Sequence, residues 1–131
     1  MNQLLAGLRV LVLEDEFLIA MDVEQLCRDH GAENVVVVRS LEEIEPSFAA
    51  EFDAAIVDLL LGGVSTLEFA ARLRDGNVPF VFASGYTDNE EISRLFPDAT
   101  LIGKPYAGDD LIEALAAACG RVSVLKRHSF P

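Results

Sequence analysis

The sequence contains no tryptophan, only two cysteines, and fewer than half as many basic residues as acidic ones. Cys27 and Cys119 belong to no CxxC pair or Cys/His cluster, which argues against a structural zinc site and a disulfide framework, so we expect two reduced thiols. Ten Lys and Arg against 22 Asp and Glu give a formal net charge of −12. Because nucleic acids and anionic membranes are bound by basic residues, the charge indicates neither as a partner.

Long apolar runs are also missing. No stretch approaches the roughly 18 consecutive apolar residues of a membrane span. The first eight residues lack the basic region and long apolar run of a signal peptide, so we expect a cytoplasmic protein. The 131 residues suit one domain, and a hydrophobic fraction of 51% suffices for a substantial core. We predict one domain over residues 1–120 and a short tail over 121–131, with no output domain.

Short apolar runs alternate with segments of helical periodicity. The runs predict strands over residues 8–13, 34–38, 54–57 (ending at Asp58), 79–83 and 99–102. Helices are predicted over residues 16–30, from residue 40 onward, from 65 to about 74, from 87 to about 96, and over 110–119. Ser40 and Ser65 each stand three residues before a glutamate, as in a capping box. Gly31 ends the first helix, and Gly62-Gly63 breaks the chain after the third strand.

Five apolar strands alternating with five helices predict an α/β fold, a doubly wound parallel sheet covered on both faces. Such open sheets bind ligands beyond the carboxyl ends of their strands. Reactive polar residues stand at four of these ends. They are Glu14, Asp15, Asp58, Ser84 and Lys104.

The carboxylates of this group predict a cation site. Two or three carboxylates at one place repel each other unless a cation joins them. Mg²⁺ prefers oxygen ligands and takes one or two carboxylates together with waters and phosphate oxygens. Glu14, Asp15 and Asp58 are the candidate carboxylate ligands, and the backbone carbonyl of Leu60 is a further candidate oxygen.

The same strand ends suit phosphoryl chemistry. A carboxylate such as Asp58 can act as a nucleophile toward phosphorus, while a metal neutralises charge on the transferring group. Lys104 would pair with one phosphoryl oxygen as a point charge, and Ser84 would donate its hydroxyl to another.

These motifs resemble the receiver domain of bacterial two-component response regulators over about residues 8–119. The resemblance rests on the acidic pair Glu14-Asp15, on VDLLLGG around Asp58, on FASGY around Ser84 and on GKPY around Lys104. Each motif is weak alone, but the four in order at strand ends are specific. PFVFASGY is further similar to a subgroup of single-domain regulators with an F-A-T-G motif, where Ser84 stands in place of Thr.

The resemblance implies a flavodoxin-like sheet with strand order 2-1-3-4-5. It implies that a sensor histidine kinase or histidine phosphotransfer protein phosphorylates Asp58, with Mg²⁺ bound by Glu14, Asp15 and Asp58. It also implies a cis bond between Lys104 and Pro105, which proline makes accessible. Because the product is the domain itself, we do not expect an ordinary enzyme. The response would pass to an unknown partner protein, and a homodimer stays open.

The sequence departs from the family at several positions. Many members carry Tyr or Phe three residues before the strand-five lysine, where this chain has Leu101, so switching through that aromatic does not carry over. Tyr86 and Tyr106 are the nearby aromatic candidates. Leu60 and Tyr86 each follow a site residue by two positions, which predicts slow loss of the phosphoryl group. Glu14 stands where Asp is common.

Three alternatives remain open from the sequence. A receiver fold can serve as an adaptor that does not depend on phosphorylation. An aspartyl-phosphate phosphatase of the haloacid dehalogenase type needs a second acid two residues after the nucleophile, where this chain has Leu60. A flavodoxin-like cofactor binder needs a phosphate-binding loop after the first strand, where Glu14, Asp15 and Glu16 would repel phosphate.

Overall fold

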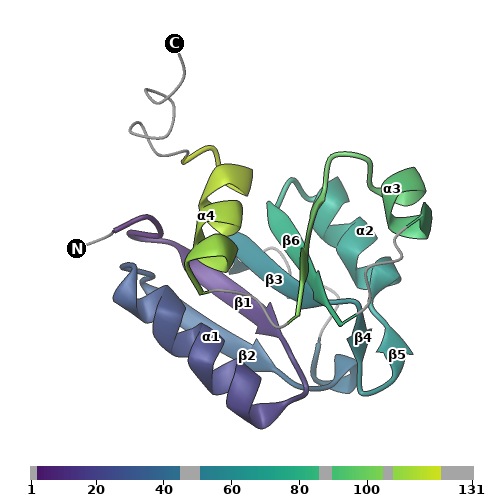
Figure 1. Ribbon diagram of the computed structural model, residues 1–131, viewed down its shortest axis with the longest axis horizontal. Coiled ribbons are helices and arrows are strands. Elements are labelled where there is room, and N and C mark those ends of the chain that lie inside the picture. The colour runs from purple at the N-terminus through teal and green to yellow at the C-terminus, as the bar shows by residue number, and fades with distance from the viewer. Residues whose placement is uncertain (1–2, 45–50, 86–89, 105–107, 122–131) are drawn as a thin grey trace.

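A five-stranded parallel sheet forms the centre of the computed structural model, which describes residues 3–44, 51–85, 90–104 and 108–121 (Figure 1). Its strands are β1 (Arg9–Leu13), β2 (Asn34–Val38), β3 (Ala54–Asp58), β6 (Phe80–Ser84) and β7 (Thr100–Gly103). They lie in the order β2-β1-β3-β6-β7, and every neighbouring pair is parallel. The predicted order 2-1-3-4-5 is confirmed, since β6 and β7 are the fourth and fifth strands of this sheet.

Helices cover both faces of the sheet. The described residues contain four α-helices, namely α1 (Phe17–Asp29), α2 (Leu67–Asp75), α3 (Glu90–Leu95) and α4 (Gly108–Ala118). Helices α1 and α4 lie on one face, and α2 and α3 lie on the other (Figure 1). As predicted, α1 ends before Gly31, whose φ of +93° is a left-handed conformation that glycine adopts without steric cost.

The helix predicted from residue 40 is only a 3-10 turn where the structure describes it. This turn, η1, spans Leu41–Glu43, and the hydroxyl of Ser40 accepts a hydrogen bond from the Glu42 N–H at 3.2 Å. The predicted capping residue is therefore correct, but the predicted α-helix is not present over these residues. The rest of the predicted helix includes residues 45–50, which lie outside the described residues.

Strict alternation along the strands divides the core into two clusters. Leu11 and Leu13 of β1 face α2 and α3, whereas Val10 and Val12 face α1 and α4. The same alternation divides β3, and all five of its residues are buried. Burial on both sides explains why the strands read as near-continuous apolar runs in the sequence.

A small hairpin that the sequence analysis missed follows β3 directly. It consists of β4 (Leu60–Leu61) and β5 (Val64–Ser65), paired antiparallel. Gly62 and Gly63 form its tip with φ of +61° and +83°, the positive values that a type I′ hairpin turn needs at both central residues. The two glycines therefore reverse the chain and do not simply break it. Because the hairpin starts at the end of β3, it lies beside the predicted site.

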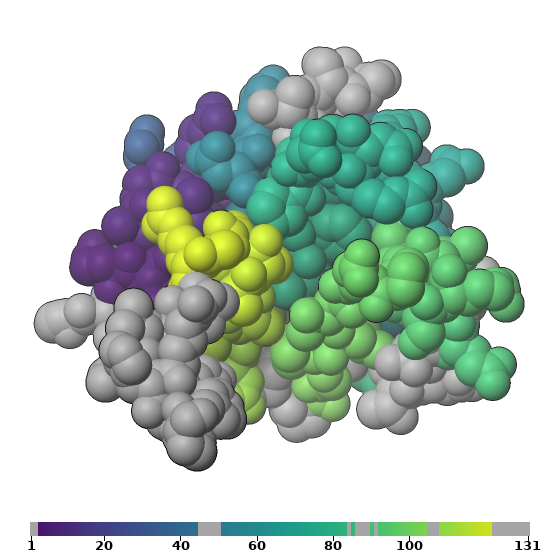
Figure 2. All heavy atoms as spheres, turned by 90° about the horizontal axis from the view of Figure 1, so that it is seen from above, coloured from purple at the N-terminus to yellow at the C-terminus, as the bar shows by residue number. Residues whose placement is uncertain are grey.

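The N-terminal segment packs against α4. Leu5 is fully buried in the cluster that α4 shares with α1, and the Arg121 guanidinium donates to the backbone carbonyls of Leu4 and Ala6 at 3.4 and 2.7 Å. Figure 2 shows α4 in yellow between the purple N-terminal part of the chain and the green residues 90–103. No helix within the described ranges has both the length and the apolarity needed to cross a membrane.

The two cysteines are free thiols, as predicted, and they differ in burial. Burial raises the pKa of Cys27 to about 12, and it also raises the pKa of the half-buried Cys119. A raised pKa leaves less reactive thiolate at neutral pH. We therefore expect iodoacetamide to label Cys119 slowly in the folded protein and Cys27 only after unfolding, as peptide mass mapping would show. Equal native labelling of both cysteines would contradict this packing.

Candidate functional site

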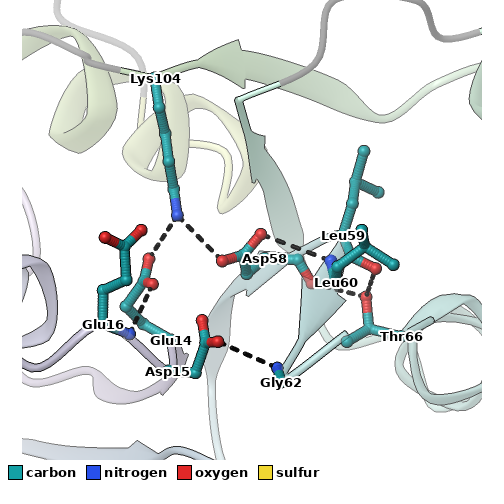
Figure 3. Close-up of polar contacts among 9 residues, drawn as sticks. All are labelled: Glu14, Asp15, Glu16, Asp58, Leu59, Leu60, Gly62, Thr66 and Lys104. Atoms are coloured by element: carbon teal, nitrogen blue, oxygen red, sulfur yellow. Dashed lines mark hydrogen bonds and ion pairs between the residues drawn. The ribbon is translucent and has the colours of Figure 1, made fainter. Parts of the chain in front are cut away.

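The carboxyl ends of β1, β3 and β7 bring three predicted residues into direct contact (Figure 3). The ammonium group of Lys104 donates a hydrogen bond to Glu14 Oε1 at 2.8 Å and another to Asp58 Oδ2 at 2.9 Å. The side chains are 13% exposed for Lys104, 3% for Glu14 and 10% for Asp58. Lys104 is 90 positions from Glu14 and 46 from Asp58 in the chain. The three residues share one ion-pair network because parallel strands end at the same edge of the sheet.

Burial and pairing oppose each other in this network. Burial raises the pKa of Glu14 above its ordinary value, against hydrogen bonds from Lys104 and from the Glu16 N–H. Burial alone would lower the pKa of Lys104, but its hydrogen bonds to Glu14 and Asp58 outweigh this effect and raise the pKa. Lys104 therefore stays an ammonium ion at neutral pH, and removing it would leave two carboxylates close together with little water.

Asp15 lies next to this network and is held by residues that the sequence analysis did not predict. The Gly62 N–H at the hairpin tip donates to Asp15 Oδ2 at 3.1 Å. Arg39 donates to the backbone carbonyl of Asp15 at 3.2 Å and lies over the ring of Phe17 at 5.6 Å. Arg39 directly follows β2, so the strand-end rule could have found it. Asp15 does not cap α1, because the helix begins at Phe17 and its N-cap residue is Glu16.

The three acidic residues fit a divalent cation. Glu14, Asp15 and Asp58 each offer a carboxylate oxygen, and these oxygens lie within 4.8 Å of one another. Oxygens bound to one Mg²⁺ at about 2.1 Å lie up to ~4.2 Å apart, so only a small closing movement is needed. The Leu60 N–H lies 3.4 Å from Asp58 Oδ1, and the role of the Leu60 carbonyl stays a prediction.

Thr66 forms a hydrogen bond with the backbone of Asp58, and the sequence analysis did not single it out. Its hydroxyl lies 2.6 Å from the backbone carbonyl oxygen of Asp58 and 3.1 Å from that of Leu59. Thr66 itself is fully buried. It is also the N-cap residue of α2, so the predicted capping box, which put Ser65 at that position, is wrong by one residue.

Other predicted residues are placed only in part. Ser84 is the last residue of β6 and pairs with Gly103 of β7, but the position of its hydroxyl is not among the described features. Its phosphate contact stays a prediction. Tyr86, Pro105 and Tyr106 lie outside the described residues, so the cis bond and the aromatic candidates stay predictions too. Leu101 packs against the core cluster beneath α2 and α3.

No family model and no curated protein matches the chain. Solved structures do match. A response regulator receiver protein from Sinorhizobium medicae WSM419 aligns with a TM-score of 0.76 at 23% identity, covering 87% of this chain and 95% of that chain. The signal receiver domain of a modulated diguanylate cyclase from Desulfovibrio desulfuricans G20 aligns with a TM-score of 0.73 at 28% identity, covering 87% and 94%.

The response regulator PhyR from Brucella abortus aligns over 98% of this chain but only 51% of its own length, with a TM-score of 0.62 at 23% identity. These likenesses show that the chain has the fold of response regulator receiver domains over most of its length. The narrower resemblance to the F-A-T-G subgroup stays a prediction.

Proposed function

We propose that this chain is a response regulator receiver domain that accepts a phosphoryl group on Asp58 in a Mg²⁺-dependent reaction and then acts on a partner protein. The observation that carries the proposal is the buried contact of Lys104 with Glu14 and Asp58, beside Asp15, at the carboxyl edge of a receiver-type sheet. A carboxylate suited to act as nucleophile, an acidic cluster suited to hold a cation and a paired ammonium group support this proposal together.

The reaction follows from these groups. A carboxylate oxygen of Asp58 forms a bond to phosphorus while the phosphorus–nitrogen bond of a phosphohistidine breaks, and the electron pair stays on the imidazole nitrogen, which takes a proton from water. The ammonium of Lys104 pairs with a phosphoryl oxygen after its hydrogen bond to the Asp58 carboxylate breaks. A cation held by Glu14, Asp15 and Asp58 would neutralise charge on the transferring group. Water later releases inorganic phosphate and restores the carboxylate.

An apolar surface beside the site supports a protein donor. The first turns of α1 expose Phe17, Leu18 and Met21 at 57%, 75% and 51%. These residues directly follow the acidic segment of the site, so a sensor histidine kinase or phosphotransfer protein would cover them as it presents its histidine. Exposed large apolar groups of this kind are typical of binding surfaces.

Acetyl phosphate offers the direct test. With Mg²⁺, we expect wild type to gain the mass of one phosphoryl group in intact mass spectrometry, with acetate as the leaving group. The increment should disappear without Mg²⁺ and in Asp58→Asn, which keeps the shape of the side chain but loses the nucleophile. Asp53→Asn, which removes a half-buried carboxylate paired with Arg9 at the other end of β3, is the matched control and should be phosphorylated like wild type.

The outcomes separate the proposal from its competitors. No mass increment in a folded protein with either small-molecule or phosphohistidine donors would overturn it and favour an adaptor that does not depend on phosphorylation. Repeated turnover of a phosphomonoester would favour a phosphatase.

A further inference from the structure

We propose that Thr66 is a positioning residue for the phosphoacceptor site, acting through the backbone of Asp58 and Leu59. The inference rests on the proposed function. The Thr66 hydroxyl is fully buried and lies 2.6 Å from the carbonyl oxygen of Asp58. A hydroxyl has one hydrogen to donate, and the short distance assigns it to Asp58, with Leu59 as a secondary acceptor at 3.1 Å. The main chain of the nucleophile is therefore tied to a side chain eight residues later.

The Thr66 hydroxyl bonds the end of β3 and does not cap the helix that Thr66 begins. An N-cap threonine ordinarily accepts a hydrogen bond from a backbone N–H in the first turn of its helix. The Thr66 side chain makes no such bond, and the Ser65 hydroxyl instead accepts from the Leu67 N–H at 3.3 Å. A residue that departs from its local preference points to a requirement elsewhere. Here that requirement is the fixed position of the β3 end.

Thr66 also closes the base of the hairpin that reaches Asp15. Its backbone N–H donates to the Leu59 carbonyl at 3.1 Å, next to the pairs Leu60↔Ser65 and Leu61↔Val64. At the tip, the Gly62 N–H donates to the Asp15 carboxylate. Because the hairpin is only two residue pairs long, the orientation of its first pair determines where its tip lies. One threonine thus fixes Asp58 directly and Asp15 through Gly62 (Figure 3).

The test compares Thr66→Val, which keeps the branched shape but removes the hydroxyl, with Thr66→Ser, which keeps the hydroxyl. We expect Thr66→Val to bind Mg²⁺ at least about tenfold more weakly in isothermal titration calorimetry, the size typical of losing an outer-sphere partner of a metal ligand. The rate of phosphorylation by acetyl phosphate should fall with it. Thr66→Ser should recover most of both. In EDTA, the Leu59 to Gly62 amides of Thr66→Val should exchange hydrogen faster than those of wild type.

A stability control removes the trivial explanation. Val10→Ala creates a cavity near the N-terminal end of β1, away from the candidate site, in the core cluster beneath α1 and α4. We expect it to lower stability while Mg²⁺ affinity at a temperature where the protein is folded stays within twofold of wild type.

The outcomes distinguish this inference from the function on which it rests. Unchanged Mg²⁺ affinity in folded Thr66→Val, with wild type phosphorylated, would overturn the positioning role alone. An equal loss in Val10→Ala, or no recovery in Thr66→Ser, would overturn it as well. Failure of wild type to bind Mg²⁺ or to accept a phosphoryl group would overturn the proposed function and this inference together.

Discussion

Replacing Lys104 by methionine is expected to destabilise the cation-free protein by about 3–5 kcal/mol, because removing one partner of a buried ion pair leaves the other charge uncompensated. Here the substitution leaves two such charges, on Glu14 and Asp58, whose side chains are 3% and 10% exposed. Glu14 can relieve part of the repulsion by taking up a proton, since burial already raises its pKa. Urea unfolding in EDTA would measure the loss.

The same variant should bind Mg²⁺ more tightly than wild type. In the cation-free protein Lys104 occupies one oxygen of Glu14 and one of Asp58, so an incoming cation competes with the ammonium for these ligands. Removing the competitor should strengthen Mg²⁺ binding by about tenfold, which corresponds to about 1.4 kcal/mol. Saturating Mg²⁺ should therefore restore more stability to Lys104→Met than it adds to wild type. Phosphorylation should nevertheless be slower, because the phosphoryl oxygen loses its partner.

Two controls separate position from charge. Lys126 is the other lysine in the chain, so Lys126→Met changes the net charge of −12 by the same unit. It should keep wild-type stability and Mg²⁺ affinity. Lys104→Arg keeps the positive charge but places it on a planar guanidinium group. It should be more stable than Lys104→Met, and it should be phosphorylated more slowly than wild type. A Lys104→Met protein as stable in EDTA as wild type would show that the ion pairs are not formed in solution.

The sheet, and the meeting of three candidate site residues at its edge, could be predicted from the sequence for one physical reason. Parallel strands buried on both faces must be apolar almost throughout, so their ends are visible in the sequence as the first polar residues. Glu14, Asp58 and Lys104 stand at such ends, and the topology brings them together without any further requirement.

The residues that sequence reasoning missed act through contacts that no local pattern contains. Arg39 and Gly62 contact Asp15 from 24 and 47 residues away in the chain. The Arg39 side chain donates to the Asp15 backbone carbonyl, and the Gly62 backbone N–H donates to the Asp15 carboxylate. Thr66 was interpreted as part of a capping box because Ser65 and Glu68 have its spacing, yet the Thr66 hydroxyl bonds the β3 end. A capping pattern measures local preference only, and tertiary contacts can override it. The Gly62-Gly63 hairpin, by contrast, could have been predicted, because a Gly-Gly pair is a common type I′ hairpin turn.

Replacing Phe82 by alanine should cost about 3–5 kcal/mol of stability, the range for deleting a buried phenylalanine side chain. Phe82 is fully buried in β6, and its ring meets those of Phe80 and Phe96 edge to face, with centroids 5.2 and 5.4 Å away. Phe80→Ala is the matched control, because Phe80 is only half-buried and should cost less. Chemical denaturation would compare the two, and equal losses would contradict the packing.

Phe82 and Lys104 should also differ in how their losses respond to Mg²⁺. Phe82 is adjacent in register to Val57, the residue before Asp58, but it lies in the core cluster beneath α2 and α3. A cavity there lowers stability without changing the charges at the strand ends, so Mg²⁺ should stabilise Phe82→Ala by the same increment as wild type. For Lys104→Met the increment should be larger, because the cation replaces the missing positive charge. A larger Mg²⁺ increment in Phe82→Ala would mean that the core beneath β6 also sets the geometry of the acidic site.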